Sequence, residues 1–329
     1  MTTLVRKASE ERLVKARKVR VDTTAVEANI HYPTDANLIQ DGVRTVTRLV
    51  KQVHKLGIST GHHFRDRTRS LKKRILSITK VLRRKTGEAF AEVRKITGEM
   101  ADIGEKALMA TKAVLRELDT SGDATVRHLA DQLKTAYERT AKVIGQARQV
   151  NAGQRQLPER LVSIFDADAR PIRRGKFHKD TEFGYKVCLT ESEERLITDY
   201  GVFEGNPPDT QLLVSAVTGH SDRVGKVPKR AATDRGFWAK KNEDALTELG
   251  VDKVSIPFRG KCSGKRREHE GQSWFRRLQR WRAGGEATIS VLKRRYGMDR
   301  TLYRGLDGAR RWVGGAIWAY NLNRIAKIA

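Results

Sequence analysis

No proline occurs between Pro33 and Pro158, and this gap constrains the fold more than any other feature of the 329-residue chain. Within the gap, apolar residues recur every three or four positions, and Lys and Arg occupy the positions between them. One such stripe consists of Leu71, Ile75, Ile78 and Leu82, and a second of Phe90, Val93, Ile96, Met100 and Ile103. This spacing is typical of amphipathic helices. We therefore predict that residues 38–157 form several long helices, with a break at 120–123 and a new helix cap there.

The segments on either side of this block have a different pattern. Residues 17–30 are rich in Val and Thr and predict a strand that contains Asp22. After Pro158, further strands are predicted at 161–169, 182–190, 195–205, 229–237 and 251–258. Helices are predicted at 206–217, 239–250 and from about Trp274 onward, with a basic loop at 259–272. The predicted domain limits are 1–37 for an N-terminal extension with the first strand, 38–157 for a helical insertion, and 158–329 for the remaining domain.

The order of the predicted elements indicates the fold class. Without the helical block, the chain reads β-β-β-α-β-α-β-α, which is the order of the RNase H-like fold. We expect an α/β protein with a mixed sheet, helices on both faces, and a large all-helical insertion after the first strand.

The charge of the chain points to a polyanionic partner. Lys and Arg number 66 against 39 Asp and Glu, which gives a formal net charge of +27. A nucleic acid relieves such repulsion by releasing its own counterions, and an anionic membrane is the second candidate. No apolar run is long enough to cross a bilayer, and the N-terminus lacks the apolar core of a signal peptide. The two cysteines lie far apart, and no nucleotide-binding Gly-rich motif occurs. We expect a cytoplasmic protein.

Three carboxylates lie where the inferred fold would bring them together. Asp22 lies in the first strand, Asp234 at the end of a later strand, and Glu286 in the last helical region. Two divalent ions held by such carboxylates are a common means of displacing a DNA phosphodiester. Mg²⁺ prefers oxygen ligands and keeps several waters, so that a few acids suffice. The position of Asp209 after two prolines predicts a helix cap. Asp209 is the alternative metal-binding carboxylate if Asp22 does not bind the metal.

The last helical region carries a mixed-charge face. Arg282, Glu286, Ser290 and Lys293 are spaced by four, four and three residues, so that they share one side of a helix. Such a face can hold a metal-binding carboxylate between cations that contact DNA phosphates. Taken alone, the spacing is more typical of intrahelical ion pairs on a solvated surface.

Several separated blocks of the sequence resemble bacterial insertion-sequence DDE transposases. They are VDTTAVEANIHYPTD (21–35), TEFGYKV (181–187), GNPPD (205–209), TDRGF (233–237) and WRAGGEATISVLKRRYG (281–297). The last block is similar to the family signature Tyr-x2-Arg-x3-Glu-x6-Lys at Arg282, Glu286 and Lys293, and departs from it at Gln279. The resemblance implies that Asp22, Asp234 and Glu286 hold two Mg²⁺ or Mn²⁺ ions. It also implies that Arg282 and Lys293 contact DNA.

The resemblance implies metal-dependent cleavage of transposon ends and strand transfer into target DNA, without a nucleotide cofactor. We expect double-stranded DNA as the partner and a homodimer on it. Further candidate DNA-binding residues are Arg235, Lys265, Arg266, Arg267 and Trp281. For Trp281, packing in the core is the alternative to stacking on an extruded base.

The region before Asp22 departs from the family pattern. Relatives typically carry a helical DNA-binding region before the first catalytic Asp, whereas 21 residues precede Asp22 here. A truncated copy, one part of a split reading frame and a misassigned start would each produce this pattern. Two alternative functions follow: an inactive remnant that only binds DNA through its basic surface, and a nuclease without strand transfer.

Overall fold

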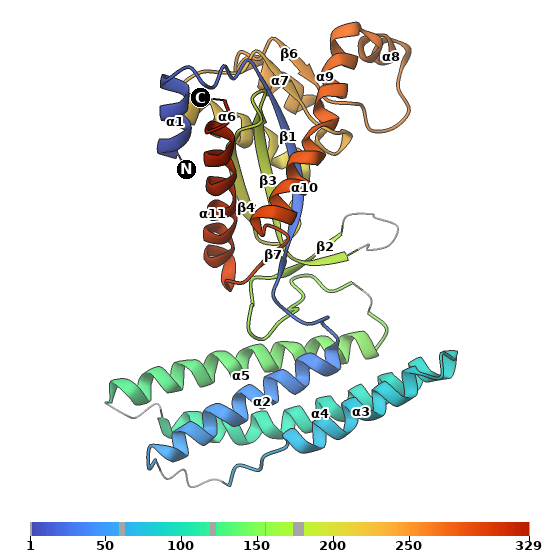
Figure 1. The fold of residues 1–329 in the computed structure, drawn as a ribbon. Coiled ribbons are helices and arrows are strands. Elements are labelled where there is room, and N and C mark those ends of the chain that lie inside the picture. The colour runs from blue at the N-terminus through green and yellow to red at the C-terminus, as the bar shows by residue number, and fades with distance from the viewer. Residues whose placement is uncertain (1, 59–62, 119–122, 155, 174–180, 329) are drawn as a thin grey trace. The chain divides into compact units, whose positions relative to one another are not determined.

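The structure, a computed structural model, describes residues 2–58, 63–118, 123–154, 156–173 and 181–328 (Figure 1). The chain divides into two compact units. Unit 1 comprises residues 1–29 and 168–329, and unit 2 comprises residues 30–167. Each unit has its own hydrophobic core, and each is described separately below.

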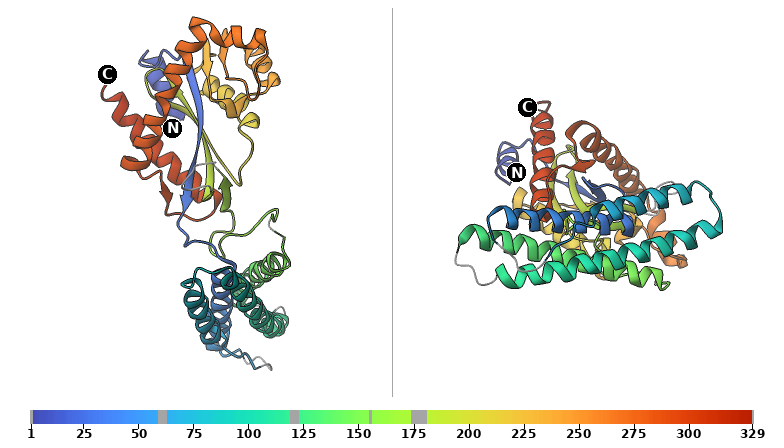
Figure 2. Two further views of the ribbon diagram at one scale, coloured as in Figure 1. Left: turned by 90° about the vertical axis from the view of Figure 1, so that its right-hand side faces the viewer. Right: turned by 90° about the horizontal axis from the view of Figure 1, so that it is seen from below.

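Unit 2 is built from long helices, as the proline-free pattern predicted. They are α2 (Asp35–Lys55), α3 (Thr68–Leu82), α4 (Gly87–Leu118) and α5 (Ala124–Asn151). Helix α2 packs against α4 and α5, and α3 packs against α4 (Figure 2). Ile39, Met100 and Leu133 are fully buried between them. Asp123 caps α5 by accepting a hydrogen bond from the Thr125 N–H at 2.7 Å, whereas residues 120–122 of the predicted break lie outside the described residues.

The predicted strand at 161–169 is wrong, since none of these residues lies in a strand and residues 161–167 of unit 2 form irregular structure. Side chains of α5 bind the backbone of this segment in place of a neighbouring strand. The Gln146 amide exchanges two hydrogen bonds with the backbone of Leu161, and Arg139 donates to the Ile164 carbonyl at 2.9 Å. Leu161 and Ile164 are buried, so the apolar pattern was correct for burial and misleading for strand formation.

Unit 1 is organised around a mixed sheet. Within the described residues its strands are β1 (Lys18–Ala28), β2 (Arg170–Arg173), β3 (Thr181–Ser192), β4 (Ile197–Phe203), β5 (Arg230–Ala232), β6 (Lys253–Ser255) and β7 (Arg300–Thr301). Strand β3 is antiparallel to β1, β2 and β4, whereas β1, β5 and β6 are parallel. The order β4-β3-β1-β5-β6 across the sheet places β1 at its centre.

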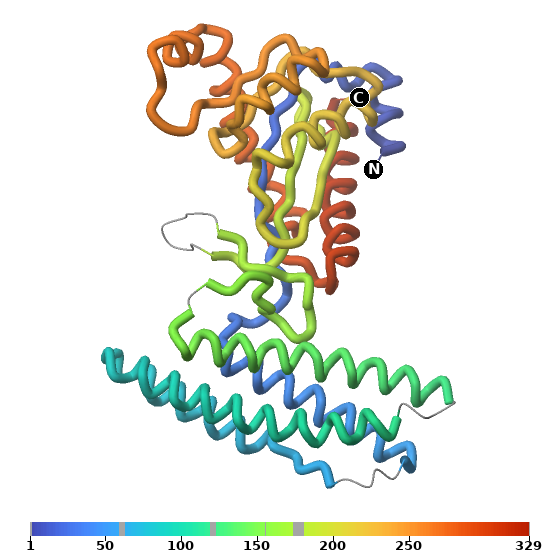
Figure 3. The backbone as a smooth tube through the Cα atoms, turned by 180° about the vertical axis from the view of Figure 1, so that it is seen from behind, coloured from blue at the N-terminus to red at the C-terminus, as the bar shows by residue number. Residues whose placement is uncertain are grey.

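Helices cover both faces of this sheet (Figures 1 and 3). They are α1 (Thr2–Glu10), α6 (Leu213–Val224), α7 (Lys240–Glu248), α8 (Gly264–Gly271), α9 (Ser273–Ala283), α10 (Gly285–Tyr296) and α11 (Gly305–Ile325). Side chains alternate along a strand, so Val19 and Val21 of β1 pack on the α6 side. Arg20 and Asp22 point to the opposite face, where they meet α9. This is an RNase H-like fold that carries a helical insertion between β1 and β2, as predicted.

The region after β6 differs from the prediction in detail. The predicted loop at 259–272 contains α8, whose first turn is capped by the Ser263 side chain accepting from the Arg266 N–H at 3.3 Å. The predicted long helix from about Trp274 is divided at Gly284 into α9 and α10, and α11 follows β7. None of the described helices combines the length and the apolar content needed to cross a membrane.

Candidate active site

The three predicted carboxylates line one pocket of about 550 Å³ in unit 1. Its lining residues are Asp22, Thr23, Thr24, Asp234, Arg282, Glu286, Ile289, Ser290, Lys293 and Arg294. They come from β1, the end of β5, α9 and α10. Segments more than 200 residues apart in the sequence therefore converge there, as the order of the elements predicts.

Strand pairing brings Asp22 and Asp234 to the same level of the sheet. Arg20 of β1 lies opposite Ala232 of β5 in a parallel register. Asp22 lies two residues after Arg20, and Asp234 lies two residues after Ala232. Asp234 lies just beyond β5 and caps a short 3-10 helix (η2, Arg235–Phe237) by accepting from the Gly236 N–H at 2.8 Å. A Cβ at Gly236 would lie 2.9 Å from the Asp209 carboxylate and 3.0 Å from that of Asp234, so a side chain at this position would displace one of them.

Glu286 enters the pocket from the first turn of α10, where an acidic side chain is stabilised by the positive end of the helix dipole. The Arg282 guanidinium lies 3.7 Å from the Asp22 carboxylate and 3.8 Å from that of Glu286. A cation at this position reduces the repulsion between the two acids. Its Nε is buried without a hydrogen-bond partner among the described residues.

The donor set has the chemistry that a divalent ion requires, since all three side chains offer carboxylate oxygens to one pocket. The Glu286 side chain is 74% exposed and the Asp22 side chain 21%, so both are open to the pocket. Among the described residues, no three acidic, His or Cys side chains are already as close together as the ligands of one bound ion.

A fourth carboxylate, Asp209, lies beside the pair of aspartates. It lines a neighbouring pocket of about 210 Å³ together with Asp22 and Asp234. The Lys186 ammonium lies 2.6 Å from the Asp209 carboxylate, which also accepts from the Thr23 hydroxyl at 3.1 Å. Asp209 is the first residue of a short 3-10 helix (Asp209–Gln211) that follows Pro208, and the residue that precedes α6 is Leu212, so the helix cap predicted at Asp209 is wrong. No sequence motif indicated the contact with Lys186.

A buried ion pair beneath the pocket was not predicted from the sequence. The Arg20 guanidinium donates to both Glu191 oxygens, from Nε at 2.8 Å and from Nη2 at 2.5 Å, and both side chains are at most 5% exposed. Arg20 also donates to the Trp281 carbonyl of α9 at 2.7 Å, and the Thr288 hydroxyl of α10 donates to Glu191 at 2.8 Å. The pair thus joins the central strands to the two helices that carry Arg282 and Glu286.

Two glycines at the junction of α9 and α10, Gly284 and Gly285, allow this close approach. A Cβ at Gly284 or Gly285 would lie 3.1 Å from a nitrogen of the Arg20 guanidinium, which Glu191 holds in place.

We expect Gly285→Val to reduce the free energy of unfolding by about 1–3 kcal/mol, because added carbon atoms in a close-packed region force displacement. Urea denaturation measures this. The matched substitution Gly145→Val, at a helical glycine with no neighbour within 4 Å, should cost less, and equal losses would contradict the explanation.

Gln279, which stands where the family signature has tyrosine, has a structural contact. Its amide nitrogen donates to the Thr233 carbonyl at 3.1 Å and to the Ser255 carbonyl at 2.9 Å. These two residues follow β5 and end β6, so Gln279 ties α9 to the edge of the sheet from which Asp234 projects.

The predicted DNA-contacting residues have unequal surroundings. Lys293 lines the 550 Å³ pocket and donates to the Ala25 carbonyl of β1 at 2.7 Å. The Trp281 ring is half-buried and lies under two cations, Lys18 at 5.1 Å and Arg20 at 4.9 Å from its centroid. Cation–π contacts of this kind hold the ring in unit 1.

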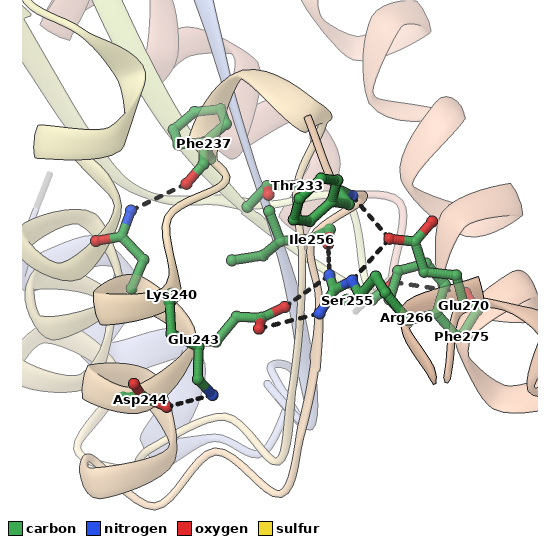
Figure 4. A network of polar contacts seen from close by, with 12 residues as sticks. Thr233, Phe237, Lys240, Glu243, Asp244, Ser255, Ile256, Arg266, Glu270 and Phe275 are labelled. Atoms are coloured by element: carbon green, nitrogen blue, oxygen red, sulfur yellow. Dashed lines mark hydrogen bonds and ion pairs between the residues drawn. The ribbon is translucent and has the colours of Figure 1, made fainter. Parts of the chain in front are cut away.

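Arg266 differs from the exposed cations around it. Its guanidinium contacts Glu243 at 2.8 Å, Glu270 at 2.8 Å and the Ile256 carbonyl (Figure 4). The side chain is 15% exposed and ties α8 to α7 and to the residue after β6. The other three candidates, Arg235, Lys265 and Arg267, are exposed.

Comparison with known proteins agrees with this geometry. The family described as "Transposase DDE domain" matches residues 159–322, about half of the chain. This range contains Asp234 and Glu286, whereas β1 with Asp22 precedes it. Neither a curated protein nor a solved structure matches the chain. The matched range, the RNase H-like sheet and the blocks of sequence similarity agree with one another, and the chain belongs to the insertion-sequence DDE transposases.

Proposed function

We propose that this protein cleaves DNA at the ends of a transposon and transfers the freed ends into target DNA. The observation that supports the proposal is the shared pocket, in which Asp22, Asp234 and Glu286 lie together with Arg282 and Lys293. A protein that only coats DNA has no need to gather three negative charges within a surface of strongly positive charge.

The three carboxylates would hold divalent ions, Mg²⁺ or Mn²⁺. Bound ions of this kind stabilise the charge on the attacking and leaving oxygens of a phosphodiester displacement. Arg282 and Lys293 lie on the same pocket and bind the non-bridging oxygens of the phosphate, which orients the scissile bond. The Arg20–Glu191 pair fixes α9 and α10 against the sheet and so positions Arg282 and Glu286.

Two displacements at phosphorus complete the reaction. In the first, a water oxygen bonds to phosphorus and the P–O3′ bond breaks, so that the products are a 3′-hydroxyl and a 5′-phosphate. In the second, this 3′-hydroxyl attacks a phosphodiester of the target, whose own 3′-oxygen leaves and takes up the proton. Neither step requires ATP or a covalent link to the protein. We propose that the chain acts in the cytoplasm, as a homodimer on DNA that brings two ends together.

The test is strand nicking and joining on a duplex that carries the terminal repeats of the element, with Mg²⁺ or Mn²⁺ and with EDTA. Metal-dependent nicking followed by joined product supports the transposase. Nicking without joining would indicate a nuclease, and binding without either reaction would indicate a protein that only binds DNA.

Because Arg266 is held in ion pairs, we expect it to contribute less to DNA binding than its exposed neighbours Lys265 and Arg267. We expect the double variant Lys265→Gln/Arg267→Gln to weaken duplex binding and to lower the slope of log K against log salt by about 1.8, which is 0.9 for each phosphate that is no longer neutralised. We expect Arg266→Gln to leave that slope unchanged and to destabilise the fold, because Glu243 and Glu270 lose their partner. Fluorescence anisotropy over a range of salt measures both. A reduced slope for Arg266→Gln would assign that residue to the DNA surface.

A further inference from the structure

A third pocket in unit 1, of about 180 Å³, is lined by four cations and no acidic side chain. Its cations are Arg195, Arg295, Arg324 and Lys327, and two tyrosines also line it. The pocket lies between α10, α11 and the turn that joins β3 to β4.

Helix α10 separates this cationic pocket from the pocket of the carboxylates. Glu286, Ser290 and Lys293 line the carboxylate pocket, whereas Thr288, Val291 and Arg295 line the cationic pocket. These two sets recur every three or four residues and are offset from each other, so they occupy different sides of one helix. A ligand in the cationic pocket would therefore contact the side of α10 that faces away from the scissile phosphate.

The four cations have no carboxylate partner within the described structure. Two arginines near the carboxylate pocket differ from them, since Arg20 pairs with Glu191 and Arg282 lies beside Asp22 and Glu286. Glu194 precedes Arg195, and one oxygen of its carboxylate accepts from the Lys15 N–H at 2.9 Å, whereas the other is buried without a hydrogen-bond partner among the described residues.

One donor in the pocket is buried and unsatisfied. Arg324 donates from Nη2 to the Glu194 carbonyl at 3.0 Å, whereas its Nε is buried without a hydrogen-bond partner among the described residues. The C-terminal end of α11 offsets part of the charge of Arg324 and Lys327. The C-terminal end of α10 does the same for Arg295, which lies in the last turn of that helix, whereas Arg195 lies on the β3–β4 turn. Cations that line one pocket repel one another, and an anion bound among them would reduce this repulsion.

Two tyrosines, Tyr296 and Tyr320, form the wall of the pocket. Their rings meet edge to face at 5.6 Å, and the Tyr320 hydroxyl donates to the Arg195 carbonyl at 2.9 Å. Burial raises the pKa of Tyr320, so that the hydroxyl remains a neutral donor at neutral pH. The wall adds no negative charge to the pocket, and the hydroxyl holds the Arg195 backbone in position.

We propose that this cationic pocket binds the phosphodiester backbone of a second DNA segment, separate from the strand that is cut. Arginines are suited to this because the guanidinium donates two parallel hydrogen bonds to phosphate oxygens. Several such contacts fix the register of a duplex without reading its sequence. The choice of DNA as the source of the phosphate rests on the proposed function.

The test uses the full chain, a labelled duplex and EDTA, so that binding is measured without cleavage. The double variant Arg295→Gln/Lys327→Gln is compared with Lys229→Gln/Lys241→Gln, which removes the same charge at exposed positions outside the pockets described above. We expect the pocket variant to lower the slope of log K against log salt by about 1.8 and the control to lower it less. We also expect the duplex to protect Lys327 from an amine-modifying reagent.

Two outcomes would overturn the proposal. The first is equal salt slopes for the two double variants with Lys327 still reactive in the complex. The second is protection of Lys327 by inorganic phosphate or a mononucleotide to the same degree as by the duplex, which would assign a small-phosphate site. The experiment is repeated with Asp234→Asn protein, because a binding defect that persists without any cleavage activity separates this proposal from the proposed function.

Discussion

Replacing Glu286 by glutamine is expected to lower the rate of metal-dependent strand cleavage about 1000-fold, while duplex binding is retained. The amide keeps the volume of the carboxylate and removes the charge that a divalent ion requires. Charge stabilisation at a metal site contributes several kcal/mol to the transition state, and about 4 kcal/mol corresponds to a factor of about 1000 in rate. Asp22→Asn and Asp234→Asn are expected to have effects of similar size. Single-turnover nicking of a terminal-repeat duplex measures all three.

The matched control is Asp222→Asn, which removes an exposed carboxylate on α6 outside the pocket. It should cleave at the unchanged rate. Cleavage by Glu286→Gln at the rate of the control would remove Glu286 from the proposed site, and Asp209→Asn would then be examined next, since Asp209 shares its pocket with both aspartates.

Breaking the Arg20–Glu191 pair is expected to reduce the free energy of unfolding by about 3–5 kcal/mol, since removal of one partner leaves the other charge buried and uncompensated. Both side chains are at most 5% exposed, so little solvent screens the remaining charge. Arg20→Met and Glu191→Gln each test this by urea denaturation. The double variant Arg20→Met/Glu191→Leu should recover much of the stability, because an apolar pair of similar volume replaces a buried ion pair at little cost.

Cleavage by the double variant separates stability from positioning. Arg20 donates to the Trp281 carbonyl and Glu191 accepts from Thr288, so neither hydrogen bond to α9 and α10 can form in that protein. We expect stable protein with slow cleavage and normal duplex binding. Recovery of stability and of the full cleavage rate together would show that the pair has no positioning role.

The helical insertion and the order of the sheet were predictable because both depend on local patterns. The three-or-four spacing from Leu71 to Leu82 predicted α3, whose bounds are Thr68–Leu82. Spacing alone did not predict which apolar residues are covered, since Leu82 is 45% exposed and Val81 is buried. That outcome depends on the neighbouring helix, which no local pattern specifies. The same reason explains residues 161–167, where partners on α5 took the backbone hydrogen bonds of the expected strand.

Of the candidate site, too, only the part that follows from the order of the elements and from sequence motifs was predictable. The convergence of Asp22, Asp234 and Glu286 followed from the order of the elements and from the resemblance, and the three residues line one pocket. Their role as metal ligands stays a prediction. The Arg20–Glu191 pair was not predictable, because its members lie 171 residues apart and neither belongs to a recognisable motif. A single arginine between valines in a central strand is the one sign that a buried partner was required.

The central position of β1 determines when this site can form during synthesis. Asp22 leaves the ribosome first, whereas β5 and α10, which border it in the finished sheet, are made more than 200 residues later. Unit 2 comprises residues 30–167, so its helices can pack as soon as that stretch has emerged. At that stage β1 is still unpaired, because the strands that flank it, β3 and β5, come later in the chain. A nascent chain therefore carries a completed helical unit well before Asp22, Asp234 and Glu286 can meet, and their shared pocket forms only once α10 has been synthesised.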